Sequence, residues 1–362
     1  MEKKTITTVA VVAVVVLILI AAVTVVTLSE DNEDNSVVTV TDGLGREVTI
    51  TSSDKVASTS LTVTEIICGL NGLSKLAGVT TDSTLSKAVE PIIGIPNDGY
   101  PGNIIAGVKN GSITDMGGMY MISAESILLA SPDLVIMGGY FNSDNTISQL
   151  ESVGIPVVVC KDDNSLENIY FNINLVGKVL GKTSEAQNLV KNMQSVIDKI
   201  VSWTKSFNIN APSVAVFMGY GSQYGTYACG VKYIIGSPMI EMLGGKNAFS
   251  TISGMYEVVT TESIITAKPD IIIDATPGSS TDLNSIKTNP LTRGLPAVVN
   301  DAVYGTFDSC STAFTMTTQS FVNSVALMAM FLYEDQLNFE IDHYLGNDFT
   351  ASLNKFWEQI NS

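Results

Sequence analysis

The pattern of apolar and polar residues contains one structural unit twice. Residues 123–137 read SAESILLASPDLVIM, and residues 260–274 read TTESIITAKPDIIID. Each copy begins with a hydroxyl residue suited to a helix N-cap and carries a glutamate, Glu125 or Glu262, in the first helical turn. A proline then ends the helix, and an aspartate follows it. The apolar run after this aspartate predicts a strand that is buried on both faces. The sequence therefore predicts the same helix, tight turn and buried strand at two places.

The remaining apolar runs predict strands that alternate with helices. Alternation in VTVTDGLGREVTI, residues 38–50, predicts a hairpin with turn glycines. Residues 82–118 and 219–230 are rich in turn residues and predict loops. Because parallel strands need crossover connections, the alternation predicts parallel sheets with right-handed crossovers. Further strands are expected at 55–59, 76–80, 155–160, 213–218 and 302–306, and helices at 62–70, at 237–243 and after Thr315.

Residues 165–207 carry helical spacing without any strand pattern. Ser165 is expected to cap a first helix, and Thr183 to open a second, in which apolar residues from Leu189 to Val201 follow helical spacing. The second helix would have about 23 residues and a length of roughly 35 Å, enough to run across two lobes. We therefore expect an α/β fold of two lobes joined by a connector. The expected boundaries are residues 37–164 for the N-terminal lobe, 165–207 for the helical connector and 208–362 for the C-terminal lobe.

The amino terminus has the composition of a membrane segment. After Lys3 and Lys4, residues 5–29 carry no charge and would form a helix of roughly 37 Å, enough to cross a hydrocarbon core of about 30 Å. Lysines before the run and acidic residues after it place the amino terminus in the cytoplasm and the rest outside. No cysteine precedes Cys68 and no clear cleavage site follows the run, so we expect residues 1–29 to be an uncleaved anchor rather than a signal segment. Residues 30–36 are expected to be an acidic tether.

Charge and residue usage exclude several classes of function. A formal net charge of −17 argues against nucleic acid as a partner, because such proteins concentrate lysine and arginine. The single histidine, His343, excludes a three-histidine zinc site, and we expect it to be a surface residue. The sequence therefore predicts no catalytic site, no metal site and no resident cofactor. The cysteines Cys68, Cys160, Cys229 and Cys310 follow neither a disulfide framework nor a zinc pattern, so one bridge or four free thiols stay open.

Candidate ligand residues are found where parallel strands are expected to end, because open α/β sheets bind ligands there. Tyrosines facing one another across a cleft suit a large and partly apolar ligand, or they fill the interface between the lobes, and both interpretations stay open. On the residues alone, Glu125 and Glu262 are more simply explained as acids that stabilise their own helices. The candidates are Tyr140 and Phe141 in the first lobe, and Tyr220, Tyr224, Tyr227, Cys229, Phe307, Asp308, Cys310 and Phe314 in the second.

A series of segments in the same order resembles a known family. From residue 38 to about residue 333 the chain is similar to the substrate-binding proteins of ABC importers for iron complexes and cobalamin. The resemblance implies two Rossmann-like lobes, one rigid helix between them, and a metal chelate held in the cleft with little lobe movement. It also implies that one glutamate of each lobe, here Glu125 and Glu262, docks on arginines of an ABC permease dimer that works with an ATPase. The segments are DGLGREVTI, STSLTVTEIICGLNGLSKLAGVT, SAESILLASPDLVIM, LESVGIPVVV, EMLGGKNAF, TTESIITAKPDIII and LPAVVNDAVY.

The small number of arginine residues limits the classes of ligand that we expect. Strongly anionic catecholate siderophores would require several convergent cations, but the chain has only two arginines, Arg46 and Arg293. Lys161 and Lys232 cannot be placed firmly from the sequence. We therefore expect a cobalamin-like corrinoid or an uncharged ferric hydroxamate, and haem stays open through tyrosine or cysteine ligation. The alternatives are a surface sensor or adhesin of the same fold and a chelatase, which would require a histidine or acidic cluster in the cleft.

Overall fold

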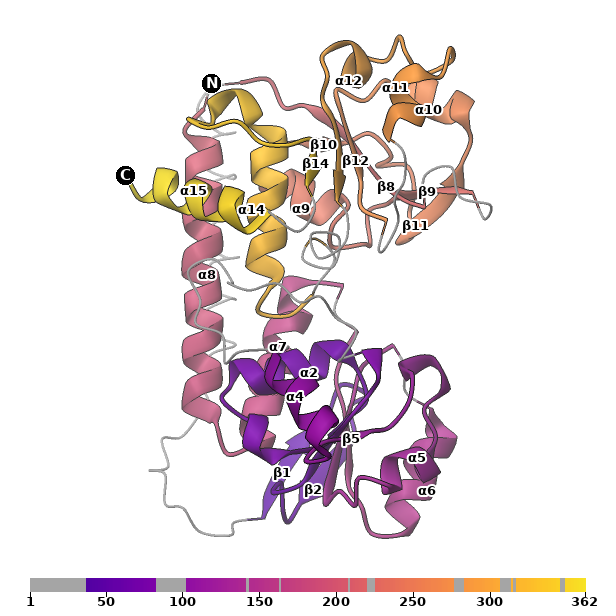
Figure 1. Cartoon of the computed structure of the whole chain (residues 1–362), viewed down its shortest axis with the longest axis vertical. Helices are drawn as coiled ribbons and strands as arrows, with labels where there is room; N and C mark the ends of the chain where they lie inside the picture. Colours follow the sequence, from indigo (N-terminus) through magenta and orange to yellow (C-terminus); the bar gives the residue numbers. More distant parts are fainter. Residues whose placement is uncertain are drawn as a thin grey trace, which may run out of the picture. The chain divides into compact units, whose positions relative to one another are not determined.

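The computed structural model describes ten ranges of the chain, and these form the unit Val37–Ser362. The predicted anchor and tether, residues 1–36, lie outside the described residues. No helix within the described ranges is both long and apolar enough to cross a membrane. The two lobes are each built on a sheet (Figure 1). The described ranges are 37–82, 102–140, 143–162, 164–207, 209–219, 225–276, 283–306, 314, 317–345 and 349–362.

The first lobe contains a sheet of five parallel strands in the order β5-β4-β3-β6-β7. Its strands are β3 (Val56–Ser58), β4 (Leu76–Val79), β5 (Thr114–Asp115), β6 (Leu134–Met137) and β7 (Val157–Val159). Its helices are α2 (Leu61–Gly69), α4 (Gly102–Asn110), α5 (Ala124–Leu128) and α6 (Asp144–Ser152), with short 3-10 turns at Leu73–Lys75 and Met119–Met121. The predicted parallel sheet is confirmed here, and every residue of β3, β6 and β7 is buried, as expected for strands covered on both faces.

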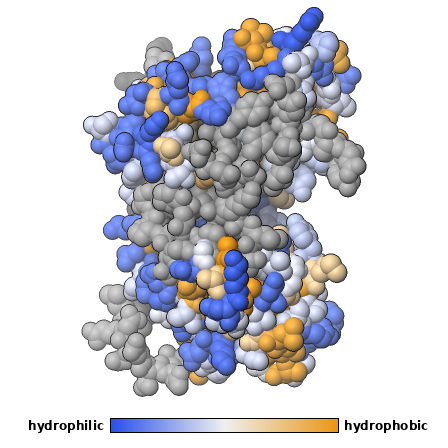
Figure 2. Space-filling model, in the orientation of Figure 1, coloured by the Kyte–Doolittle hydropathy of each residue, from blue (hydrophilic) through white to orange (hydrophobic). Residues whose placement is uncertain are grey.

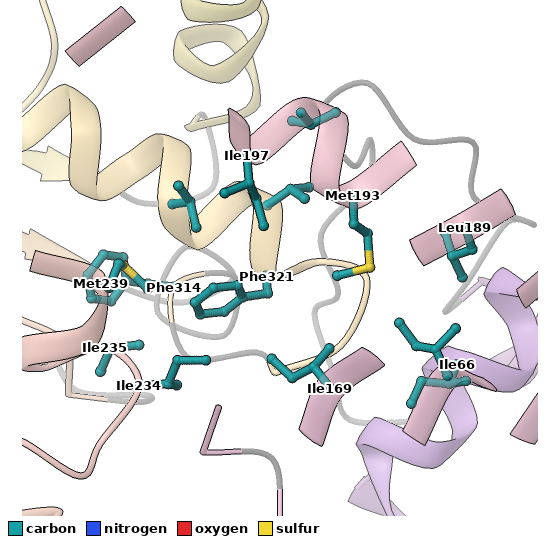
Figure 3. Close-up of a cluster of buried hydrophobic side chains, with 14 of the residues drawn as sticks. Ile66, Ile169, Leu189, Met193, Ile197, Ile234, Ile235, Met239, Phe314 and Phe321 are labelled. Carbon is teal, nitrogen blue, oxygen red and sulfur yellow. The ribbon is translucent and has the colours of Figure 1, made fainter. Parts of the chain in front are cut away.

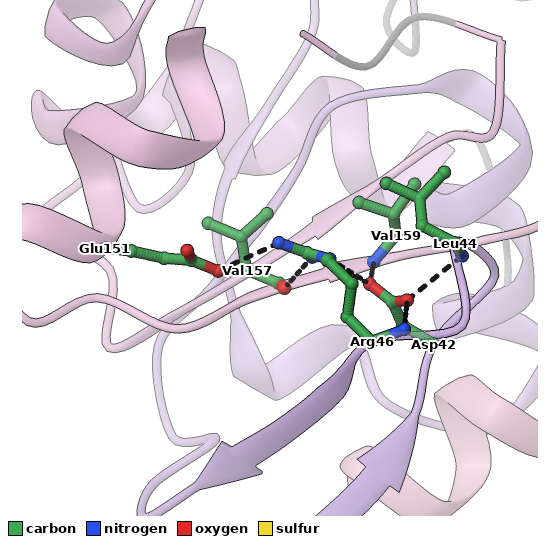
Figure 4. Close-up of polar contacts among 6 residues, drawn as sticks. All are labelled: Asp42, Leu44, Arg46, Glu151, Val157 and Val159. Carbon is green, nitrogen blue, oxygen red and sulfur yellow. Dashed lines mark hydrogen bonds and ion pairs between the residues drawn. The ribbon is translucent and has the colours of Figure 1, made fainter. Parts of the chain in front are cut away.

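The predicted hairpin is formed by β1 (Val38–Thr41) and β2 (Glu47–Ile50), which pair antiparallel. Its turn is fixed by the buried carboxylate of Asp42, which accepts hydrogen bonds from Leu44 N (3.0 Å) and Arg46 N (2.9 Å) (Figure 4). The Arg46 guanidinium contacts Asp42 Oδ2 at 2.7 Å and donates to Val157 O at 2.8 Å. Gly43 N also donates to Val159 O at 2.6 Å. The hairpin is therefore tied to the end of β7.

The connector consists of two helices, α7 (Leu166–Val179) and α8 (Thr183–Lys205). Ser165 caps α7 by accepting a hydrogen bond from Asn168 N, as predicted. The predicted long helix is confirmed with 23 residues, and its buried positions follow the expected helical spacing. Helix α8 contacts α7 of the connector and α14 (Phe321–Leu332) of the second lobe (Figure 1).

The second lobe contains a larger, mixed sheet in the order β11-β9-β8-β12-β13-β14, with β10 paired to β8. Strands β8, β12, β13 and β14 are parallel, whereas β9 and β11 run antiparallel to their neighbours. Residues 219–230 were expected to form a loop, but the last part of this range forms strand β9. Its strands are β8 (Ser213–Met218), β9 (Thr226–Cys229), β10 (Lys246–Asn247), β11 (Tyr256–Val259), β12 (Ile271–Asp274), β13 (Val303–Thr306) and β14 (Tyr344–Leu345). Its other helices are α9 (Ser237–Met242), α10 (Thr261–Ala267), α11 (Leu283–Thr288), α12 (Pro296–Val299) and α15 (Phe349–Asn361), with a 3-10 turn at Glu334–Gln336.

One hydrophobic core runs through both lobes and the connector. Its buried side chains include residues of α2, α7, α8, α9 and α14, so one apolar interior is shared by the first lobe, the connector and the second lobe (Figure 3). Interiors packed in this way transmit strain and deform little. The continuous core supports the rigid connection that the family resemblance implied. Residues in view are Ile66, Ile169, Leu189, Met193, Ile197, Ile234, Ile235, Met239, Phe314 and Phe321.

The two copies of the repeated unit form the same structure. Helices α5 and α10 begin directly after Ser123 and Thr260, whose side chains cap them, and β6 and β12 follow as inner strands of their sheets. Both helices end before the prolines, and the residues in front of the prolines, Ser131 and Lys268, have positive φ angles of 46° and 47°.

The aspartate that follows each proline in the sequence has a structural role that the sequence did not indicate. Asp133 Oδ1 accepts a hydrogen bond from Lys55 N at 3.0 Å, directly before β3. Asp270 Oδ2 accepts one from Ser213 N at 2.9 Å, at the start of β8. In return, Asp133 N and Asp270 N donate to the carbonyls of the same two residues. Each Pro-Asp turn therefore fixes the start of the neighbouring central strand.

Candidate functional site

A pocket opens where the parallel strands of the first lobe end. Its cavity volume is about 140 Å³, and its walls come from the segments that follow β3, β6 and β7. The lining is completed by Ile66 of α2, Met119, Asn172 of α7 and Thr317, which precedes α14. This is the edge at which open α/β sheets bind ligands. The lining residues that follow the strands in the sequence are Ser60, Leu61, Thr62 and Val63 after β3, Gly138, Gly139 and Tyr140 after β6, and Cys160 and Lys161 after β7.

Tyr140 is the described candidate that lines this pocket, and its side chain is 46% exposed. A half-exposed tyrosine offers a ligand both an aromatic face and a hydroxyl group. Six predicted candidates lie outside the described residues: Phe141, Tyr220, Tyr224, Phe307, Asp308 and Cys310.

Three of the predicted ligand residues lie outside the described lining of this pocket. Tyr227 belongs to β9 and packs edge-to-face on Tyr256, with ring centroids 5.7 Å apart. Cys229 and Phe314 are fully buried in the core. Burial also raises the pKa of the Cys229 thiol, which disfavours the thiolate that a metal would bind. Cys229 and Phe314 are therefore core residues, and their selection as cleft residues is corrected.

Lys161 is the positively charged residue of the pocket. Asn172 binds its backbone twice, because Lys161 N donates to Asn172 Oδ1 (2.8 Å) and Asn172 Nδ2 donates to Lys161 O (3.0 Å). The ammonium group lies over the ring of Phe171, 4.2 Å from its centroid. Lys232, the other lysine considered, is exposed and lies outside the described lining. The structure therefore shows that Lys161 lies in the pocket, a position that could not be determined from the sequence.

Glu125 and Glu262 are both exposed, as expected, and lie in the first turns of α5 and α10. A hydrogen bond from its own backbone lowers the pKa of each carboxyl, and the caps Ser123 and Thr260 lower it further. Both groups therefore carry their negative charge near neutral pH. Helices α5 and α10 lie on the same side of the view in Figure 1, opposite α8.

Apolar side chains accompany each glutamate. Beside α5, Tyr120 and Met121 are 76% and 88% exposed, and Figure 2 shows an apolar patch in the region of this helix. Beside α10, a groove is lined by Glu262 together with Val258 and Val259. Exposed apolar groups around a charge are typical of surfaces that bind another protein.

A buried carboxylate joins the two lobes and was not found from the sequence. Glu65 of α2 is 1% exposed and accepts hydrogen bonds from the hydroxyls of Thr318 (2.6 Å) and Ser320. Gln319 Nε2 donates to Glu65 O at 2.7 Å. Burial raises the pKa of Glu65 to about 7, although the two hydroxyl donors lower it. The signal in the sequence was a charged residue inside the apolar helix TVTEIICGL.

His343 is not the surface residue that the sequence predicted. Its side chain is 20% exposed, and Nε2 lies 3.0 Å from Glu334 Oε1. The hydrogen bond with Glu334 raises the pKa of His343, against the effect of burial. Tyr304 donates to the same carboxylate at 2.5 Å, which places the histidine in a polar network at the edge of the second sheet. Within the described residues, no group of acidic, histidine or cysteine side chains could hold a metal ion.

Comparison with known proteins agrees with this architecture. Residues 56–309 match the family model described as "Periplasmic binding protein". The chain is 27% identical over 239 residues to the uncharacterized ABC transporter substrate-binding lipoprotein YvrC of Bacillus subtilis, covering 65% of this chain and 68% of that protein.

The names of two further similar proteins mention a ligand, heme. The high-affinity heme uptake system protein IsdE of Staphylococcus aureus is 26% identical over 148 residues, which cover 40% of this chain and about half (49%) of IsdE. Among solved structures, the apo form of the periplasmic heme-binding protein RhuT of Roseiflexus sp. RS-1 superposes with a TM-score of 0.60. It shares 19% sequence identity, with 78% of this chain and 99% of RhuT covered. This likeness establishes the fold.

Proposed function

The chain belongs to the periplasmic binding protein family, and we propose that it captures a metal chelate between its lobes and delivers it to an ABC importer. Its relatives are substrate-binding proteins of transport systems, so it is a binding protein and not an enzyme, as expected. The chelate is a haem, a corrinoid or a ferric siderophore. The names of two relatives, which mention heme, support the first of these.

The observation that carries the proposal is the exposed glutamate in each lobe. Glu125 and Glu262 occupy the same position in two equal units, each behind a capping residue and each beside exposed apolar groups. A permease made of two similar subunits requires two similar contacts, one from each lobe. Capping of their own helices explains one such acid, but it does not explain the matched pair.

Charge reversal at both positions tests the docking step. In cells that depend on this importer, the double variant E125K/E262K is expected to reduce chelate uptake to background. Chelate affinity and melting temperature should stay unchanged, because both side chains are exposed and lie outside the described lining of the pocket. The matched control is E185K, a charge reversal at the exposed first turn of the connector helix α8. Normal uptake by the double variant would refute the docking role.

Chelate binding itself is tested on the full chain in detergent. A chelate present at about one thousand times its Kd stabilises the folded state by about 4 kcal/mol through mass action. We expect a rise in melting temperature with at least one of haem, cobalamin, cobinamide or a ferric hydroxamate. No shift with any of them would refute chelate capture, whereas binding without uptake would favour the sensor alternative.

The proposed location is the outer face of the cytoplasmic membrane. The apolar residues 5–29, flanked by Lys4 and by the acidic tether, support an anchoring helix that leaves the binding lobes outside. The name of YvrC, which calls it a lipoprotein, supports membrane attachment of a related protein. Fractionation with alkaline carbonate tests the anchor, because an integral helix stays in the pellet and a cleaved protein is released.

A further inference from the structure

The backbone that carries Lys161 is held from three directions. A Cβ atom at Gly43 would lie 2.4 Å from Lys161 N, and one at Gly139 would lie 2.3 Å from Lys161 C. The hairpin turn and the segment behind β6 thus press directly on the main chain of residue 161. Asn172, only 4% exposed, binds the amide and the carbonyl of the same residue from α7. A side chain that leaves a backbone fixed in this way is already oriented before a ligand arrives.

The charge of Lys161 is not neutralised by a described residue. Its ammonium group contacts the ring of Phe171, and no ion pair joins it to a carboxylate among the described residues. The described lining of the pocket contains no aspartate or glutamate. Three other cavities differ in this respect, because each is lined by at least one glutamate: Glu257 and Glu262, Glu47 and Glu151, or Glu167.

This positive pocket contrasts with the chain as a whole, which carries a formal net charge of −17. A chain with such an excess of acidic residues repels anions in general, so an anion that binds requires a specific cation. Lysine meets this requirement as a point charge with three donors. The first turn of α2, which lines the same pocket, adds the positive end of a helix dipole.

We propose that Lys161 binds a carboxylate of the ligand, so that the captured chelate is one with acidic groups at its rim. This inference rests on the proposed function and narrows its substrate class. Two sources share the chemistry: the propionates of an iron porphyrin and the free carboxylates of a ferric carboxylate siderophore. The uncharged ferric hydroxamate expected from the sequence would leave Lys161 buried against the ligand without a partner, which costs affinity.

Matched probes separate these sources. The full chain in detergent is titrated with ferric protoporphyrin IX and with its dimethyl ester, which keep the same macrocycle and differ only in the carboxylates. Ferric citrate represents the carboxylate chelates, and cobalamin and a neutral ferric hydroxamate represent the uncharged ones. Each is measured with the unchanged protein and with K161Q, K161R and K191Q. Lys191 is an exposed lysine of α8 outside the described lining of the pocket, so K191Q controls for loss of charge alone.

The unchanged protein is expected to bind ferric protoporphyrin IX or ferric citrate more tightly than the ester and the uncharged chelates. K161Q should weaken that carboxylate chelate by about tenfold to a hundredfold, the value of a hydrogen bond to a charged group. K161R should restore most of the affinity, and K191Q and ester binding should not change. Melting temperatures of all variants should lie close together, because K161Q removes only one contact of the side chain, that of the ammonium group with the Phe171 ring.

Three outcomes would overturn the inference. If a chelate binds but K161Q leaves the affinity for every carboxylate chelate unchanged, Lys161 is not an anion site and the proposed function survives. The same conclusion follows if the uncharged chelates bind more tightly than the carboxylate chelates. If no chelate binds the unchanged protein, the proposed function fails and the inference fails with it.

Discussion

The two copies of the repeated unit are alike in their helices and differ where their strands end. Behind β6, Gly138 and Gly139 open the chain toward the pocket of the first lobe. Behind β12, the buried Asp274 instead accepts a hydrogen bond from Thr276 N at 3.2 Å, and Gly219 N donates to the Thr276 hydroxyl at 2.5 Å. The first copy therefore ends in a close approach of backbones, and the second in a network of side chains.

This difference assigns separate tasks to the two ends of the unit. In the proposed function, the helix end presents a glutamate to a partner with two similar halves, so the two copies have reason to remain alike. In the same proposal, the strand end faces the ligand, which is one molecule without matching halves, so the two copies are free to differ there. Substitutions at each end therefore give the sharpest tests.

The largest effect is expected at Gly139. In G139V the new side chain would overlap the carbonyl carbon of Lys161, which a Cβ alone would approach to 2.3 Å. Overpacking of a close backbone contact costs about 1–3 kcal/mol or more, and the displaced lysine should also weaken chelate binding. Denaturant unfolding and chelate titration measure the two losses. The control is G102A, since a Cβ at Gly102 meets nothing within 4 Å. Equal stability of the two variants would contradict the close contact between Gly139 and the main chain of Lys161.

The second effect concerns the junction between the lobes that carry the two copies. Burial raises the pKa of Glu65 from 4.5 to about 7, so between these values the folded state binds more protons than the unfolded state. Stability should therefore fall as pH rises through this window, by up to about 3 kcal/mol. E65Q cannot ionise and should flatten this slope, becoming more stable than the unchanged protein at about pH 8. Urea unfolding at about pH 5 and pH 8 measures it.

The exposed acid Glu262 supplies the control for this experiment. Its pKa is lowered, so E262Q should leave the fall between about pH 5 and pH 8 in place. A slope that E65Q does not change would show that another group causes the pH dependence.

The smallest effect compares the two Pro-Asp turns directly. Asp133 accepts hydrogen bonds from Ser52 Oγ (2.6 Å) and Lys55 N (3.0 Å), whereas Asp270 accepts one from Ser213 N (2.9 Å). Hydrogen bonds contribute about 1 kcal/mol each, so D133A should cost about 2 kcal/mol and D270A about 1. Chemical denaturation of both variants decides this order. Equal losses would mean that the Ser52 contact adds nothing.

Much of the fold was predictable because its signals are local. Helix α8 and the repeated units carry complete patterns of spacing and capping in their own residues. Strand β11 does not, because the side chains of Tyr256, Glu257 and Val258 are all exposed and show no alternation. Helix α4 was hidden in a stretch rich in glycine and proline. The edges of the second sheet were therefore missed, and its centre was found.

The candidate site depended on contacts between distant residues, which limited its prediction. Tyr140 was found because it lies in the loop that follows a predicted strand. Lys161 could not be placed, since its position depends on Gly43 and Asn172, which lie on other elements. Glu65 and its partner Thr318 are separated by 253 residues. Burial of Cys229 and Phe314 likewise follows from the packing of whole elements and not from their neighbours in sequence.

The glycine contacts around Lys161 have a consequence for protein engineering. Because Gly43, Gly139 and Asn172 hold the main chain of residue 161, its position does not depend on its own side chain. The residue can therefore be exchanged without rebuilding the pocket. K161E would present a carboxylate from the same place and should favour a cationic chelate. Under the proposed function, the selectivity for ligand charge would then be adjustable at one codon, while the proposed docking residues Glu125 and Glu262 stay unchanged.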